Sequence, residues 1–468
     1  MTHVKAGQRR RTSTGRTCDG YDPPPTTKLA QFVTVLPVHY QSQEVRAFQY
    51  FHERTLVQLA TLMPDDFWNE TVLQMSNSEQ GIWHSIVALS AYHELYLTGA
   101  RSRHERQDSF ALRHYNLSIK SILGPQRTST DAHIHVASCI MFICIETLRG
   151  NISAVVGLLK VGYSVLKEAR TTTALCDSPG STPGPQTSID TLYRQAHAFF
   201  TRLASQLYML VGKLDPIVSM IGDEMIETTA LDRLKDAQFQ TIREAQFVLS
   251  SVRMEFERFE PGCIPTVAAK LDAWSVAFEK FRKRNAANLT SVAEKRMVAI
   301  LDLHKEFFEV ELDVHSTGDS VDHLQWDVHC DKFEEMLSLA EKATDMSDVP
   351  QQLASGPQFH MHTGAVPVIY AIIAKCRDPT IRRRAASLMA SRPRLEGVWN
   401  SVTVSRLALM IMAVEERGVP SRSCVDIPAE SRVRGVRVIQ VANNQYMVGY
   451  ETSRGWCWNQ VEKFQSIQ

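Results

Sequence analysis

The sequence has no closely paired cysteines, no long apolar run and no excess of either charge. Its nine cysteines include no Cys-x-x-Cys pair, so the spacing that is typical of thiolate metal sites is missing. Its 51 acidic and 51 basic residues give zero net charge, which disfavours a general role in coating polyanions. The longest apolar stretches, residues 82–91 and 136–145, are too short to span a bilayer. No secretory signal is expected either, and we predict a soluble intracellular protein with reduced thiols and no membrane partner.

The sequence also lacks the linear motifs of common enzyme classes. It has no Gly-x-Gly-x-x-Gly after a strand, no phosphate-binding loop, no Gly-x-Ser-x-Gly and no His-Glu-x-x-His. We therefore expect that the protein is not an enzyme. An all-α ligand-binding protein or enzyme is the weaker alternative, because a helical bundle can enclose a pocket without any linear motif.

Helical periodicity dominates the 468 residues, of which 44% are hydrophobic. This length suggests two or three modules. Apolar residues recur at three-to-four spacing from Arg46 onward, which predicts an all-α fold, either a multi-helix bundle or a helical-repeat-like domain. The expected helices cover residues 46–62, 78–98, 106–123, 131–148, 151–170, 189–212, 231–259, 264–284, 289–315, 321–344, 364–376, 378–390 and 396–418.

Several positions have specific expected roles in these helices. Ser76 or Ser78 is expected to cap the helix 78–98, and the helix 131–148 is apolar nearly all round, as expected at the centre of a bundle. Asp378 and Pro379 suit the N-cap and N1 positions of one helix. The Ser-, Pro- and Gly-rich residues 171–188 predict a mobile loop.

The periodicity changes to two after Pro420. Two alternating runs, residues 433–441 and 446–450, are separated by Asn443-Asn444 and predict a β-hairpin. Trp456 and Trp458 lie on a possible third strand. We therefore expect a small C-terminal β-hairpin or three-stranded patch.

The N-terminal segment Ser13-Thr-Gly-Arg-Thr-Cys-Asp-Gly-Tyr21 has no apolar periodicity and cannot bury a core of its own. It resembles the closing segment of the fungal binuclear zinc cluster, in which six cysteines hold two zinc ions in a small DNA-reading module. Cys18 matches the last of these cysteines. Gln8 and Arg11 stand where the family has its preceding Cys-x-x-Cys pair, and Ala6 stands where an earlier cysteine would be. Of the six zinc ligands of the family, this chain therefore keeps one, Cys18.

A single thiolate cannot hold zinc, which takes about four ligands in a tetrahedral site, so we expect that this chain as written binds none. Either its start comes from a truncated or mis-spliced gene model of an intact regulator, or the protein has lost its DNA-binding module; the detail kept between Gly15 and Tyr21 favours the first. Basic residues before the first acid, Asp19, can contact DNA phosphates or act as a nuclear import signal, although a solvated tail explains them as well. They are Lys5, Arg9, Arg10, Arg11 and Arg16.

Later segments resemble the helical regulatory domain of the same family. Phe48-x-x-Phe51 followed by Phe67-Trp68 is similar to its start, and residues 374–401 are similar to its closing helices in the order Cys-Arg-Asp-Pro, Ile-Arg-Arg-Arg and Leu-Glu-Gly-Val-Trp. The resemblance implies a remnant of the zinc cluster, a linker, a helical regulatory domain and a C-terminal β segment. Their respective ranges are 1–22, 23–44, 45–418 and 419–468.

The resemblance implies a fungal regulator of RNA polymerase II transcription that acts in the nucleus. In its intact form it would bind zinc and specific DNA sequences, as a homodimer or as a heterodimer with another zinc-cluster regulator. The alternative is a co-regulator without a zinc cluster that acts through protein–protein interaction.

Other polar patterns are interpreted as structural. His133-x-His135 and His360-x-His362 have no acid or cysteine at a helical interval to complete a metal site. Residues 322–331 are rich in His and Asp, but adjacent helical positions do not face one ligand. Arg382, Arg383 and Arg384 point in different directions around a helix, which predicts a solvated face with at most one inward contact.

Overall fold

The computed structural model describes residues 41–63, 66–99, 104–124, 131–176, 186–211, 238–258, 262–316, 324–345, 347, 356–420, 422–442 and 445–462. The chain divides into two units, Met1–Val45 and Arg46–Gln468. Helix α1 begins in the first unit, at Ser42, and the other described elements belong to the second unit.

The first half of this unit is helical. Two short π-helical segments, Phe51–Thr55 and Phe67–Thr71, interrupt its first helices. The helices are α1 (Ser42–Tyr50), α2 (Leu56–Leu59), α3 (Val72–Ser78), α4 (Gln80–Thr98), α5 (His104–Ile122), α6 (Ala132–Leu148), α7 (Ile152–Cys176) and α8 (Gln186–Val211).

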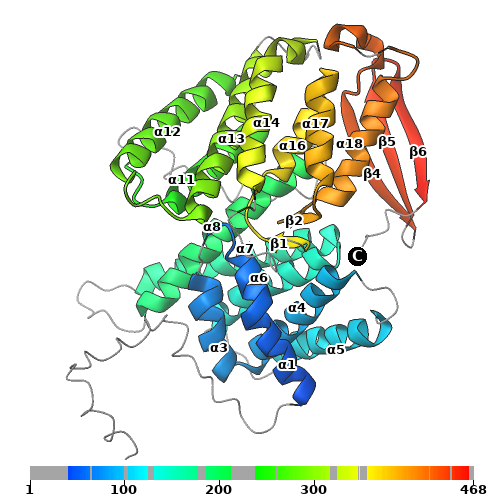
Figure 1. The fold of residues 1–468 in the computed structure, drawn as a ribbon. Coiled ribbons are helices and arrows are strands. Elements are labelled where there is room, and N and C mark those ends of the chain that lie inside the picture. Colours follow the sequence, from blue (N-terminus) through cyan, green and yellow to red (C-terminus); the bar gives the residue numbers. More distant parts are fainter. Residues whose placement is uncertain are drawn as a thin grey trace, which may run out of the picture. The chain divides into compact units, whose positions relative to one another are not determined.

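The second half consists of helices and two small sheets. Its helices are α11 (Ile242–Arg258), α12 (Ile264–Arg284), α13 (Val292–Ser316), α14 (Cys330–Thr344), α16 (Val366–Lys375), α17 (Pro379–Ala390) and α18 (Ser401–Glu415). Figure 1 shows α13, α14, α16, α17 and α18 side by side, in agreement with the contacts between successive members of this row. The described residues are thus predominantly helical, and the all-α prediction is confirmed.

Helix α6 lies at the centre of the first half, as its sequence predicted. Every residue from Val136 to Leu148 is buried, because the helix contacts α4, α7 and α8 around its circumference. Helix α4 is likewise buried from Gly81 to His93. Two helices that are apolar on nearly all sides therefore need partners on all sides, and the surrounding amphipathic helices supply them.

The first sheet joins segments on either side of α16 and α17. Strand β1 (Gln358–His360) pairs in parallel with β2 (Arg394–Glu396), and β2 pairs antiparallel with β3 (Trp399–Asn400). The sequence did not indicate this sheet, because its strands are only two or three residues long. A helix was predicted from residue 396. It begins instead at Ser401, where the Asn400 side chain accepts hydrogen bonds from the Val402 and Thr403 amides.

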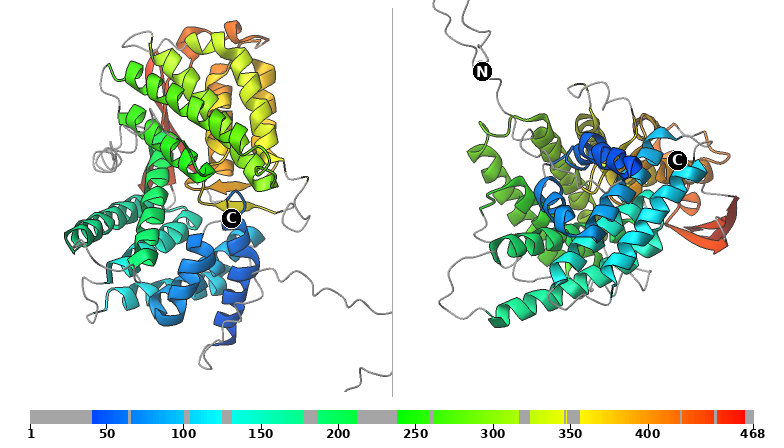
Figure 2. Two further views of the ribbon diagram at one scale, coloured as in Figure 1. Left: turned by 90° about the vertical axis from the view of Figure 1, so that its left-hand side faces the viewer. Right: turned by 90° about the horizontal axis from the view of Figure 1, so that it is seen from below.

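The second sheet confirms the predicted C-terminal strands. Strands β4 (Gly435–Ala442), β5 (Gln445–Thr452) and β6 (Gly455–Glu462) form an antiparallel meander. Val436 and Tyr450 lie opposite each other on β4 and β5 and pack against a buried cluster formed by Ala374, Ile411 and Val433. Figure 2 shows the sheet at the edge of the helical region, beside α18.

Some other boundaries differ from the predictions. Ser78 is the last residue of α3, and the N-cap of α4 is Glu79, whose side chain makes no capping bond. Helix α7 continues to Cys176 and α8 starts at Gln186, so both ends of the predicted loop 171–188 are helical and its middle lies outside the described residues. The predicted helix 321–344 is a 3₁₀ turn, Gln325–His329, followed by α14. None of the described helices combines the length and apolar character needed to cross a membrane.

Candidate functional site

The residues singled out for zinc and DNA lie outside the described part of the chain. Cys18, the candidate zinc ligand, and the basic residues Lys5, Arg9, Arg10, Arg11 and Arg16 all precede residue 41, where the described structure begins. The roles proposed for them stay predictions. The polar sites that the structure does describe belong to the helical region.

The first of these is a polar junction, which we define as Gln58, His93 and Gln206 together with the backbone of residues 357–363 and 397–398 that they bind. The Gln58 Oε1 atom accepts hydrogen bonds from the Phe359 amide, at 2.8 Å, and from His93 Nε2, at 3.1 Å. Its Nε2 atom donates to the Pro357 carbonyl at 3.1 Å. One amide side chain of α2 thus fixes the entry into strand β1.

Gln206 of α8 makes equivalent contacts with the segments that follow β1 and β2. Its Nε2 atom donates to the Met361 carbonyl at 3.3 Å and to Thr363 Oγ1 at 3.1 Å. Its Oε1 atom accepts from the Val398 amide at 3.2 Å, and its backbone carbonyl accepts from Trp399 Nε1 at 3.2 Å. A fully buried glutamine therefore provides hydrogen-bond partners for polar groups of both the loop after β1 and the turn between β2 and β3.

Burial keeps the histidines of this region neutral. It lowers the pKa of His93 to about 3 and that of His360 to about 4, because the imidazolium ion loses its hydration. Since Gln58 Oε1 can only accept, His93 donates through Nε2 and accepts from Thr55 through Nδ1, at 2.9 Å. This hydrogen-bond pattern therefore requires a neutral His93 imidazole with its proton on Nε2.

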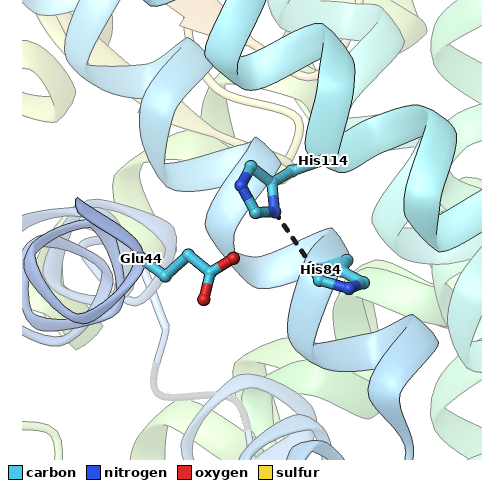
Figure 3. Close-up of side chains that lie close together, drawn as sticks. All are labelled: Glu44, His84 and His114. Atoms are coloured by element: carbon cyan, nitrogen blue, oxygen red, sulfur yellow. Dashed lines mark hydrogen bonds between the residues drawn. The ribbon is translucent and has the colours of Figure 1, made fainter. Parts of the chain in front are cut away.

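A pair of histidines, His84 and His114, lies between α4 and α5. Figure 3 shows the rings of His84 and His114, whose Nδ1 atoms are 3.0 Å apart. Burial first, and then the neighbouring His84 and Arg113, lower the pKa of His114 to about 4. Next to the pair, the hydroxyls of Ser85 and Ser118 are 2.7 Å apart. Polar contacts of this kind fix the register of two closely packed helices.

The second site is a buried ionic cluster, which we define as Arg377, Arg382 and Glu415. The three side chains are fully buried. Arg377 Nη2 lies 2.9 Å from Glu415 Oε1, and Arg382 binds the other carboxylate oxygen. Although burial raises the pKa of Glu415, the two guanidinium groups outweigh burial and lower it below its usual value. The carboxylate is therefore charged.

The cluster also holds the start of the C-terminal segment. Glu415 Oε1 accepts a hydrogen bond from the Val433 amide at 2.8 Å. The preceding residue, Arg432, forms a two-pronged ion pair with Asp327, with N···O distances of 2.9 and 2.7 Å. Residues just before β4 are thus fixed to helices far away in the sequence by charged groups.

The arginine run behaves as its helical spacing predicted. Arg382 is the inward contact, whereas Arg383 and Arg384 are partly exposed and bind Glu416, Glu334 and Glu341 on the surface. The sequence did not reveal that the inward arginine belongs to a charged cluster. The signal available in the sequence was the position of Glu415 one helical turn after Ile411, which places an acid on the apolar stripe of its helix.

The histidine-rich segments are engaged with protein groups. His360 Nδ1 binds the His362 carbonyl at 3.1 Å, and His362 Nδ1 lies 3.4 Å from Gln246 Oε1. His133 and His135 are half-buried on α6. His329 Nε2 lies 3.2 Å from the Asp313 carboxylate, while residues 321–323 lie outside the described part.

Comparison with known proteins finds a family match for the first part of the helical region. Residues 46–210 match the family described as the fungal specific transcription factor domain. Over 555 aligned positions, the chain is 22% identical to the aspercryptin biosynthesis cluster-specific transcription regulator atnN of Emericella nidulans, covering 91% of this chain and 87% of the relative. No solved structure matches the chain. The chain therefore carries a fungal specific transcription factor domain, at residues 46–210.

Proposed function

We propose that this protein is a nuclear regulator of fungal transcription by RNA polymerase II, in which the helical region is the regulatory part. The observation that carries the proposal is the family match over residues 46–210, which end in α8. The relative is named as a transcription regulator, and the similarity to it extends over most of both chains. Both findings name transcription regulators, and we propose no catalytic residue.

The proposed organisation follows the family. Residues 1–22 are the end of a DNA-binding module, 23–44 a linker, 45–418 the regulatory domain and 419–468 a C-terminal β segment. The buried ionic cluster supports treating the last two parts as physically linked, because Glu415 binds the Val433 amide. A regulatory surface would then include both helices and sheet.

DNA contact is proposed for the N-terminal end. Lys5, Arg9, Arg10, Arg11 and Arg16 supply positive charge for phosphates, and in the intact family zinc folds the module that reads bases. This chain keeps Cys18 alone of the six ligands, so we propose that it binds no zinc as written. Sequence-specific binding would require the missing cysteines or a dimer partner that has them.

The relative's name supports a more specific target. It is a regulator specific to a biosynthetic gene cluster, and we propose that this chain also controls a set of biosynthetic genes. Transcript profiles of a deletion strain test this: a few adjacent genes should change together. Scattered changes, or none under any growth condition, would contradict the proposal.

The direct test is occupancy of promoters. A tagged full-length protein should accumulate in nuclei, and chromatin immunoprecipitation should enrich the promoters of the affected genes. A variant lacking residues 1–22 tests the N-terminal contribution, since it should keep the helical region but lose enrichment. A protein that neither enters nuclei nor associates with chromatin would overturn the function proposed here.

A second candidate is a co-regulator without a zinc cluster. It is favoured by the presence of Gln8, Arg11 and Ala6 where the family has cysteines. Such a protein would show no specific shift of DNA in a gel but would co-purify with an intact zinc-cluster regulator. In this case, promoter enrichment would disappear when the partner's gene is deleted and would survive loss of residues 1–22.

A further inference from the structure

A surface groove lies between the end of α14 and the end of α17, far in sequence from the proposed DNA-binding residues. Its volume is ≈ 500 Å³. Its lining comes from α14 and the residue after it, from α17, and from the segment leading into β2. The residues are Glu341, Lys342, Thr344, Asp345, Leu388, Ser391, Arg392 and Arg394.

Two arginines of this groove form no ion pair with a carboxylate in the described part of the chain. Arg394 is buried, with 4% of its surface exposed, yet its Nη1 and Nη2 atoms reach only the Leu388 carbonyl, at 3.3 Å, and Ser391 Oγ, at 3.5 Å. Among the described residues, neither its Nε atom nor Arg392 Nη1 has a hydrogen-bond partner, although both atoms are buried. The buried arginines of the ionic cluster, Arg377 and Arg382, in contrast bind the Glu415 carboxylate directly.

The acidic residues of the groove are already engaged. Glu341 Oε1 lies 2.9 Å from Arg384 Nη2. The Asp345 carboxylate accepts hydrogen bonds from the Ser347 amide, at 2.9 Å, and from its hydroxyl, at 3.0 Å. Behind the groove, Glu396 attracts Arg394 electrostatically, but its carboxylate binds the Val366 amide. Because Ser347 is neutral, the charge of Asp345 remains, but the three cations Lys342, Arg392 and Arg394 still outnumber it and leave the groove positive.

This arrangement is unfavourable without an anion. Burial lowers the pKa of Arg392, and burial together with the nearby Arg392 charge lowers the pKa of Arg394, which reflects the cost of holding two cations in a partly desolvated place. An oxyanion removes that cost, since guanidinium groups bind carboxylate and phosphate through charge-assisted hydrogen bonds. A groove of this volume has room for a small molecule as well as its anionic group.

We propose that this groove binds the carboxylate or phosphate group of a small anionic ligand through Arg392 and Arg394. Binding needs no DNA and joins the end of α14 to the segment that enters β2. The ligand would thereby stabilise the contact between these two segments of the helical region.

The test uses the full-length chain and two probes, inorganic phosphate and citrate, at constant ionic strength set with chloride. Thermal unfolding should shift to higher temperature in a saturable way with phosphate, citrate or both. A response to phosphate alone identifies a phosphorylated ligand, and a response to citrate alone identifies a carboxylate ligand. The absence of any saturable shift with both probes would overturn the proposal.

Arg392→Gln removes one unpartnered cation from a partly exposed position. We expect a dissociation constant raised about tenfold or more, because a hydrogen bond to a charged group is lost, while the unfolding temperature without ligand stays the same or rises. The matched control is Arg383→Gln on α17, which makes the same charge change outside the groove and should keep the affinity. Equal affinities in the two variants would mean that the shift is unspecific.

Ser391→Asp tests the same idea from the opposite side. It places a carboxylate beside Arg394 within the chain, so the unfolding temperature without ligand should rise and the response to the anion should disappear. A variant that is folded and still responds like the unmodified chain would contradict the proposed binding site.

Discussion

The side chain of Gln206 occupies the space that a Cβ atom at Gly397 would need. Such an atom would lie 1.7 Å from Gln206 Oε1. The glycine also has a φ of +56°, in the left-handed region that other residues adopt at a cost. The polar junction between α8 and the turn joining β2 and β3 therefore depends on the absence of a single methyl group.

Gly397→Ala is expected to destabilise the protein by more than backbone strain alone. The left-handed conformation costs about 1–3 kcal/mol for a residue with a side chain. The displaced Gln206 amide also loses several hydrogen bonds, each contributing about 1 kcal/mol. Urea denaturation, monitored by circular dichroism, measures the total decrease in the free energy of unfolding.

Gly418→Ala is the matched control for this variant. Gly418 has a φ of +76°, but a Cβ atom there would meet no atom within 4 Å. It should therefore show the strain without the clash. Equal losses in the two variants would mean that Gln206 moves aside freely and that the polar junction contributes little.

Glu415→Gln is expected to destabilise the region by about 3–5 kcal/mol, because it leaves the buried Arg377 without its counter-charge and leaves Arg382 with only the Glu416 carboxylate, at 3.5 Å. It also weakens the acceptor of the Val433 amide, so hydrogen exchange in β4 should speed up. Glu334→Gln, which affects an exposed ion pair with Arg384, should leave the stability nearly unchanged. If both variants lost the same stability, the buried cluster would not be what holds the C-terminal segment.

The sequence predicted those elements whose signals are local. Helix α12 begins and ends at the predicted residues, since Pro265 lies at its start and its apolar residues keep a regular spacing. The α17 cap was equally accessible, because the Asp378 side chain binds the Thr380 and Ile381 amides just beyond it. In both cases a few neighbouring residues determine the structure.

The parts that escaped prediction depend on distant partners. Trp399 was expected at the start of a helix but lies on a strand, because β2 pairs with β1, more than thirty residues earlier. Nothing near Arg382 in the sequence indicates Glu415, its partner across the cluster. The role of Gln206 similarly depends on the segments around residues 361 and 398. Such sites follow from tertiary packing and have no local motif.

Acid should destabilise the protein well before its exposed carboxylates titrate. Burial lowers the pKa of His93 to about 3 and of His114, His304 and His360 to about 4. In the unfolded chain each takes up a proton near pH 6.5. Their stabilising effect is therefore complete above pH 6.5 and is lost as the pH falls from there towards 4.

One buried acid opposes this trend. Burial raises the pKa of Glu396 to about 7, so this group takes up a proton in the folded state first and stabilises it as the pH falls from 7 towards 4.5. For these four histidines and Glu396 alone, the net uptake on unfolding near pH 5.5 is about three protons, which corresponds to a loss of about 4 kcal/mol per pH unit. The buried His362, whose pKa lies well below its usual value, adds to this loss. Urea midpoints measured between pH 7 and 5 check this slope.

His93→Gln tests the assignment of the acid effect. Glutamine can still donate to Gln58 and accept from Thr55, but it takes up no proton. The pH dependence of the free energy of unfolding should therefore become less steep by about 1.4 kcal/mol per pH unit. An unchanged slope, or a stability of the unmodified chain that is flat between pH 7 and 5, would contradict the neutral state assigned to the buried histidines.

The thiols of α6 should resist alkylation as long as the protein is folded. Cys139 and Cys144 are buried; burial raises the pKa of Cys139 to about 12 and also raises that of Cys144. The thiolate is the reactive form, and a pKa near 12 leaves about a thousandfold less of it than an ordinary cysteine has at neutral pH. Cys457 on β6 is exposed and is the internal reference.

Brief treatment with iodoacetamide at pH 7.5, followed by mass spectrometry of the peptides, measures these rates. We expect labelling of Cys457 within minutes, with Cys139 and Cys144 unmodified until urea unfolds the chain and all three react alike. Labelling of Cys139 and Cys144 should begin at the same urea concentration at which the helical signal is lost, because α6 contacts α4, α7 and α8 and cannot open alone. Labelling of Cys139 in the native protein at the rate of Cys457 would mean that α6 is not the buried centre of this domain.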